Sequence, residues 1–149
     1  MINNRFIVDG ICKALSEEFG SDYEIYTEDV HEGLVEPCFT VRLLKPSQKQ
    51  FLNNRYHRTH LFCIHYFPKS DDANDECFDV SDRLNECLEY ITVDGDLIRG
   101  TNMNSEMTDG VLSFFVNYNM FVIKKRDDEV PVMETYTQTT SVKDDDDNG

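Results

Sequence analysis

The segment LIRGTNMNSEMTDGVLSFFVNYNMFVIK, residues 97–124, decides the fold of this 149-residue chain. Asp109-Gly110 is the strongest hairpin-turn signal in the sequence, because both positions of a tight hairpin turn favour residues that tolerate a positive φ. Before it, Leu97 to Met107 predicts a strand, and after it Val111 to Lys124 predicts a long one. Apolar residues alternate along the second strand at 112, 114, 116, 118, 120 and 122, so one face should be buried.

Three further strands are expected upstream of this hairpin. They are residues 22–28, Cys38 to Leu44 and Thr59 to Phe67. The last has apolar residues on both faces, which is typical of a central or doubly covered strand. The connection from Lys45 to Arg58 is basic and rich in turn formers, so we expect a long hairpin with a cationic, partly apolar tip.

Two helices complete the pattern. Residues 4–19 have helical spacing, with Asn3 or Asn4 as the cap and Gly20 beyond the end, and a second helix runs from about Cys77 to Tyr90. The sequence predicts an α+β fold, a mainly antiparallel β-sheet with two helices packed on one face, in the order α-β-β-β-α-β-β. Residues 1–126 form one domain, and 127–149 form an acidic, extended or disordered C-terminal arm.

The overall composition excludes several classes of protein. The net charge is −15, which argues against a generic nucleic-acid binder because phosphate neutralisation needs a positive surface. No apolar run reaches the roughly 18 residues that a membrane span needs, and we see no signal peptide. The five cysteines are an odd number without a CxxC pair, so we interpret them as reduced, buried thiols.

Charge is distributed unevenly along the chain. Residues 37–70 contain no acidic residue and carry +6, whereas residues 127–149 carry −7. One interpretation is a solvated surface with chance clustering. The other is a subunit with unlike poles, which would favour head-to-tail contacts between copies and hence a ring or a filament.

The candidate interface residues follow from this second interpretation. Phe51 and Leu52 either fold back onto their own domain or anchor in a neighbour's pocket, within a basic surround. The candidate interface with a neighbouring subunit comprises Arg42, Lys45, Lys49, Phe51, Leu52, Arg55 and Arg58. The acidic arm would contribute Asp127, Asp128, Glu129 and Glu134.

The sequence gives only weak indications of a metal site or of a catalytic site. On an extended strand His57, His60 and His65 cannot converge, and Cys63 with His65 gives two of the four ligands of a structural zinc. Asp94, Asp96, Asn102 and Glu106 miss the calcium-loop pattern at its fifth and sixth positions. There is no G-x-S-x-G or glycine-rich phosphate loop, although a Cys–His dyad formed in space stays open. We expect no metal, no cofactor and no enzyme activity.

Three runs carry a family resemblance: DYEIYTEDVHEGLVEPCFTVRLL, LFCIHYFPKS and DVSDRLNECLEYITVDGDLIRGTNMNSEMTDGVLSFFVNYNMFV. They resemble the tail terminator, or tail completion, family of tailed phages and phage-tail-like particles from Gram-positive hosts. The resemblance covers roughly residues 2–134 and is strongest to the contractile-tail group. The terminal KDDDDNG lies outside it.

The resemblance implies an α+β subunit of a six-membered ring at the head-proximal end of the tail tube. Such a ring stops tube growth and presents the surface that joins the neck of the capsid. The implied partners are copies of the chain, the tail tube protein, a neck or connector protein and the sheath protein, with no nucleic-acid sequence recognition and no membrane. The implied place is the tail–neck junction of the virion, after assembly in the host cytoplasm.

Two other functions remain open at the level of sequence. A head–tail connector or neck adaptor would also form rings. An acidic DNA mimic would account for the −15 charge but not for the +6 segment.

Overall fold

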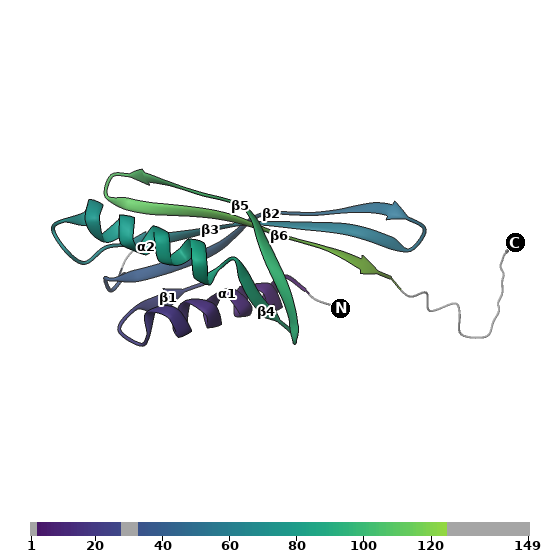
Figure 1. Ribbon diagram of the computed structural model, residues 1–149, viewed down its shortest axis with the longest axis horizontal. Helices are drawn as coiled ribbons and strands as arrows, with labels where there is room; N and C mark the ends of the chain where they lie inside the picture. The colour runs from purple at the N-terminus through teal and green to yellow at the C-terminus, as the bar shows by residue number, and fades with distance from the viewer. Residues whose placement is uncertain (1–2, 28–32, 125–149) are drawn as a thin grey trace, which may run out of the picture. The chain divides into compact units, whose positions relative to one another are not determined.

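The computed structural model describes residues 3–27 and 33–124. It confirms the α+β fold: two helices and one six-stranded, mostly antiparallel sheet in the order β1-β2-β3-β6-β5-β4 (Figure 1). The elements are α1 Asn4–Phe19, β1 Glu24–Tyr26, β2 Cys38–Leu52, β3 Arg55–Phe67, α2 Ala73–Cys87, β4 Tyr90–Val93, β5 Asp96–Thr108 and β6 Val111–Ile123. β1 is parallel to β2, whereas β5 is antiparallel to both β4 and β6.

The chain divides into two compact units. Of the described residues, the first unit comprises 3–27, 33–49 and 57–122, and the second comprises 50–56, 123 and 124. The expected domain boundary at residues 126 and 127, and the acidic arm, lie outside the described residues.

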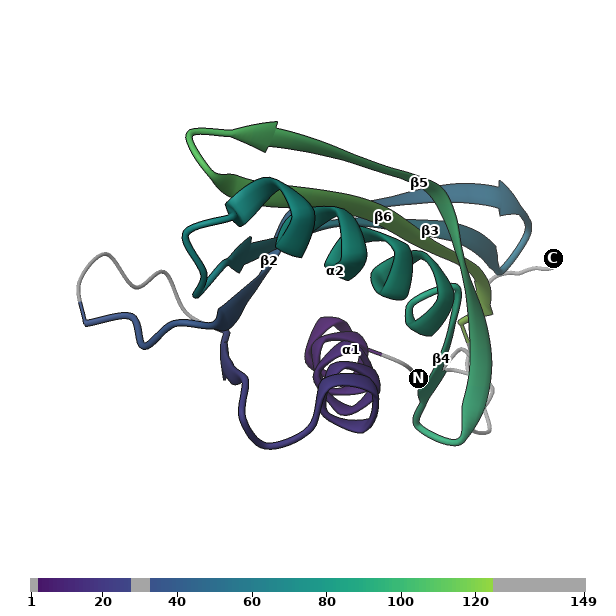
Figure 2. The same ribbon diagram turned by 60° about the vertical axis from the view of Figure 1, so that its left-hand side comes forward.

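Both helices cover the same face of the sheet, as predicted (Figures 1 and 2). Their apolar faces and alternate residues of the strands form one core. Removing this apolar surface from water stabilises the fold by roughly 25 cal/mol per Å². The largest fully buried side chains are Tyr66, Tyr118, Phe39, Phe62, Phe114, Ile7, Ile11, Leu15, Ile64, Leu84, Leu88 and Ile91. β3 is an interior strand, with β2 on one side and β6 on the other, as predicted.

The hairpin of β5 and β6 forms where the sequence predicts it. Asp109 and Gly110 have φ of 53° and 77°, the backbone that a tight hairpin turn of this hand requires. Leu112, Phe114, Val116 and Tyr118 are buried on one face of β6, so the alternation is confirmed.

The first helix also begins and ends as predicted. The Asn3 side chain accepts a hydrogen bond from the Phe6 N–H at 2.9 Å, and Gly20 has a φ of 85° just past the last turn. Arg83 joins α2 to the end of α1: its Nε donates to Glu18 Oε2 at 2.9 Å, and its guanidinium lies 4.2 Å from the centre of the Phe19 ring.

The expected long hairpin forms, but its strands run further into the basic connection from Lys45 to Arg58 than predicted. β2 continues to Leu52 and β3 begins at Arg55, with Asn53 and Asn54 between them. Asn53 takes a φ of 53°, which suits asparagine. The hydroxyls of Ser47 and Thr59 hydrogen-bond between the two strands. Residues 44–52 of β2 are all exposed, so they lack the apolar alternation that marks a half-buried strand.

The second helix is shorter than predicted and a sixth strand follows it. α2 ends at Cys87 and Tyr90–Val93 forms β4, which pairs antiparallel with residues 96–99 of β5. The Gly100 N–H donates to the Glu89 carbonyl at 2.6 Å, so the chain leaves α2 directly into the sheet. Leu88 and Ile91 continue the helical spacing of the buried residue Leu84, which explains why the sequence places the helix end too late.

Candidate assembly interface

The outer side of β2 is the first feature that could meet another protein. β1 pairs only with Cys38–Thr40, so from Val41 onward no strand lies on that side among residues 3–27 and 33–124. The side chains of Arg42, Lys45 and Lys49 are exposed on this stretch. Backbone N–H and C=O groups along such an edge can pair with another strand.

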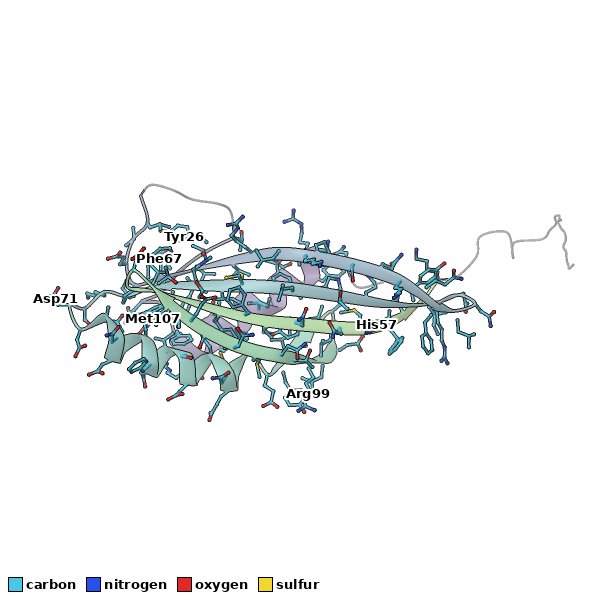
Figure 3. The ribbon with its side chains drawn as sticks, turned by 90° about the horizontal axis from the view of Figure 1, so that it is seen from above. Tyr26, His57, Phe67, Asp71, Arg99 and Met107 are labelled. Carbon is cyan, nitrogen blue, oxygen red and sulfur yellow. The ribbon has the colours of Figure 1, made fainter. Side chains whose placement is uncertain are left out.

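The opposite margin of the sheet has a second open edge. β4 pairs with residues 96–99 of β5 and the Gly100 N–H donates to the Glu89 carbonyl, but within the described ranges no strand pairs with the outer side of Thr101–Thr108. A register shift between Thr101 and Asn104 bends β5 near the start of this stretch, and Asn102 has a φ of 52°. In Figure 3, Met107 of β5 and Phe67 of β3 lie at the same end of the sheet, and Arg99 lies towards the other.

Acidic side chains accompany this β5 edge. Ser81 of α2 and Ser105 of β5 hydrogen-bond through their hydroxyls at 3.0 Å, so α2 runs beside the strand. Glu106 is exposed on β5. Exposed carboxylates of α2 are Asp75, Asp79, Asp82 and Glu86. The two edges therefore differ in charge, with basic residues on β2 and acidic residues at β5.

The predicted apolar anchors lie in the second unit. Phe51 is 62% exposed and Leu52 is 57% exposed, and Arg55 is exposed at the start of β3. Within this unit Gln50 Nε2 donates to the Asn53 carbonyl at 2.7 Å, and the Lys124 N–H donates to the Asn54 carbonyl at 2.9 Å. These bonds tie the turn to the end of β6.

Arg58 differs from the other predicted interface residues because it contributes to the fold. Its side chain is half-buried, and its Nη2 donates to Asn4 Oδ1 at 3.5 Å, at the first turn of α1. The acidic candidates Asp127, Asp128, Glu129 and Glu134 lie outside the described residues.

Sequence reasoning missed other exposed apolar residues. Phe78 of α2 is 60% exposed and Leu97 of β5 is 69% exposed. Phe78 is one position away from the buried stripe of Cys77, Val80 and Leu84, so the helical period could have identified it. No sequence pattern indicates the open edges, because strand pairing is a contact between segments that are distant in the sequence.

His60 and His65 make contacts within the fold. His60 is fully buried and its Nδ1 donates to the Tyr118 carbonyl at 2.9 Å. His65 Nδ1 lies 3.4 Å from Thr40 Oγ1, and its Nε2 lies 3.6 Å from Cys63 Sγ. Among residues 3–27 and 33–124, no three His, Cys, Asp or Glu side chains come together as a metal site.

The five cysteines are free thiols, as expected: Cys38, Cys63 and Cys77 are buried, and Cys12 and Cys87 are half-buried. Burial raises the pKa of Cys63 to about 11, and burial with Glu18 raises that of Cys87 to about 12. These thiols are therefore protonated at neutral pH and weakly nucleophilic.

A depression of about 320 Å³ between α1 and β4 is lined by Lys13, Glu17, Glu18 and Cys87, among others. Glu18 is held there by Arg83 at 2.9 Å, and the Cys87 thiol is protonated. The Cys87 thiol is therefore not an activated nucleophile in this depression. Neither helix of the described chain is long and apolar enough to cross a membrane.

Comparisons with known proteins give a family. One solved structure without a descriptive name is 9% identical and covers 85% of this chain and 99% of its own, but its TM-score of 0.47 is too low to support an argument. No curated protein matches the sequence. The family described as "phage tail terminator protein" matches residues 6–130. This chain therefore belongs to the phage tail terminator family, and it is a structural protein of the virion with a role in tail assembly.

Proposed function

We propose that this chain forms a ring, six-membered by the resemblance, that caps the head-proximal end of the tail tube. The ring binds the last layer of tube subunits and offers no surface to which another tube layer can add. Its other face joins the neck and, in a contractile tail, meets the last ring of sheath. The observation that carries the proposal is the family match over residues 6–130.

The charge pattern supports assembly by contact between copies. Residues 37–70 carry +6 while the rest of the chain carries the excess of acid. Unlike poles on one subunit favour heterologous contacts, and such contacts close into a ring when the rotation between neighbours divides a full turn. Exposed apolar side chains at Phe51 and Leu52 are of the kind that anchor an interface.

The experiment removes the chain from an otherwise complete set of tail proteins. We expect tubes of variable, excess length that fail to join heads, because nothing stops their growth. Supplying the full chain in trans should restore a uniform length. Tubes that keep a uniform, unchanged length without this chain would contradict capping, and normal tails that merely fail to join heads would favour a neck adaptor instead.

A further inference from the structure

The two open margins of the sheet suggest how copies of this chain meet. Val41–Lys49 is the open stretch of β2, and Thr101–Thr108 is the open stretch of β5. They lie on opposite margins of one sheet, because β2 and β5 are separated by β3 and β6. A subunit with two different open edges at opposite margins can pair head to tail.

The backbone of each edge has unused hydrogen-bonding capacity. Along an edge strand, roughly half of the residues direct their N–H and C=O groups away from the sheet. For β2 this applies from Val41, where β1 no longer pairs, and for β5 it applies after Gly100, whose N–H still donates to the Glu89 carbonyl. The regular part of the β5 edge is Asn104–Thr108, beyond the register shift.

The two edges differ in charge, and this difference indicates which edge of one copy pairs with which edge of the next. The β2 stretch has Arg42, Lys45 and Lys49 and no acidic residue, so two β2 edges repel each other. The β5 stretch has Glu106 and no basic residue, and the acidic helix α2 lies beside it through the Ser81–Ser105 hydrogen bond. Pairing of β2 with β5 therefore brings opposite charges together, whereas pairing of like edges does not.

The strand directions also suit such a joint. β2 and β5 run in opposite directions in the sheet (Figure 1). A second copy in the same orientation therefore presents its β2 edge antiparallel to the β5 edge of the first. Antiparallel pairing gives perpendicular backbone hydrogen bonds. Pro46 lacks an N–H, which is tolerated on an edge strand and limits indiscriminate pairing along β2.

We propose that the contact between neighbouring copies is a strand-to-strand joint, in which the basic β2 edge of one copy pairs with the β5 edge of the next. This inference rests on the proposed ring and names the surface that would close it. The acidic C-terminal arm of the same chain is the other candidate for binding the β2 edge. The test below distinguishes binding of this arm from binding of a second copy.

The test uses the full-length chain with a photoreactive benzoylphenylalanine in place of Lys45, mixed with unmodified chain labelled with ¹⁵N. After irradiation at the concentration where the chain self-associates, mass spectrometry should identify a link from position 45 to residues 101–108 of the labelled copy. The same probe in place of Glu17, which is exposed on α1, is the matched control and should give no link to that stretch.

Charge exchange supplies a second measurement. Ser105 faces α2 and Val41 faces the core, so Arg42 and Glu106 both lie on the sheet face away from the helices. Arg42→Glu and Glu106→Arg should each weaken self-association roughly three- to tenfold at low salt, and a mixture of the two variants should recover most of that loss. Links from position 45 to residues 125–149 of its own chain, links to another surface, no self-association, or no recovery in the mixture would each overturn the joint. These outcomes leave the tube-length experiment unaffected, so the joint can fail while the capping proposal stands.

Discussion

The Tyr66 hydroxyl, near the end of β3, donates a hydrogen bond to Glu76 Oε2 in the first turn of α2. The backbone N–H groups of Lys69 and Ser70 donate to the two oxygens of the same carboxylate, each at 2.9 Å. Burial raises the pKa of Glu76, but these hydrogen bonds outweigh it and lower the pKa to about 2. One carboxylate thus fixes the chain reversal from the sheet into α2.

We expect Glu76→Gln to lower the free energy of unfolding by about 1–3 kcal/mol at pH 7, the range for hydrogen bonds to charged groups. Because the folded pKa lies below the ordinary 4.5, the wild-type chain should lose this stabilisation as pH falls from about 4.5 towards 2. Urea unfolding at pH 7 and pH 3 measures both effects. Asp75→Asn, on the same helical turn, is the control, and equal stability of Glu76→Gln and wild type at pH 7 would contradict this role.

His60 should make the fold sensitive to mild acid. Burial lowers its pKa below the ordinary 6.5, partly offset by the bond to the Tyr118 carbonyl, and its Nε2 has no hydrogen-bond partner among the described residues. The unfolded chain therefore binds a proton more readily, so stability should fall as pH drops below about 6.5.

The measurement is thermal unfolding between pH 7.5 and pH 5. His65, whose pKa is lowered by burial and by Arg42, adds to the same slope. His60→Gln should reduce the slope and the double change with His65→Gln should reduce it further. A slope unchanged in the double variant would show that other groups cause the pH dependence.

Gly100 is required by the space around it. A Cβ added there would lie 2.8 Å from Val116 Cγ2 and 2.9 Å from the Leu88 carbonyl oxygen, which is backbone. Gly100→Ala should therefore destabilise the chain by about 1–3 kcal/mol, the usual effect of overpacking. Thr108→Ala, at the exposed end of the same strand, should change stability by less than about 0.5 kcal/mol. A similar loss from both changes would argue against a steric cause.

The basic residues of the predicted interface should act on assembly through charge. Lys49→Glu with Arg55→Glu should weaken ring formation, and the loss should be larger at low salt because screening is weaker there. Arg5→Glu with Lys13→Glu, at two exposed positions of α1, changes the net charge by the same amount and is the control. Assembly yield measured by negative-stain microscopy at two salt concentrations checks this, and a yield that the control variant lowers equally would remove the site-specific interpretation.

The apolar pair should affect assembly more than folding. Phe51→Ser with Leu52→Ser changes side chains that are 62% and 57% exposed, so the melting temperature should shift little. If they anchor in a partner, tail completion should fall at least tenfold, as for interface residues that contribute more than about 1.4 kcal/mol. Leu97→Ser, at 69% exposure, is the matched control. Completion equal to wild type would exclude Phe51 and Leu52 as anchors.

The predictable parts of the fold are those whose pattern is local. The alternation from Leu112 to Tyr118, the Asp109-Gly110 turn and the Asn3 cap are each fixed within a few residues, and all are confirmed. The outer half of β2 was not predictable, because Lys45 to Gln50 is polar on both faces and is a strand only through its pairing with β3.

The candidate interface was also predictable only in part. Clustering of basic residues is visible in sequence, and Arg42, Lys45 and Lys49 do lie together on one strand. That Arg58 contacts Asn4 was not predictable, because the two residues are distant in sequence. The open edges depend on how far β1 and β4 extend along their neighbours, which only the paired strands reveal.

The most direct test of the central claim is electron microscopy of complete tails in which this chain carries a label. Capping predicts a single labelled ring at the end of the tube nearest the head, and unlabelled tails without that ring when the chain is absent. Label spread along the tube, or found on heads and missing from isolated tails, would contradict the claim.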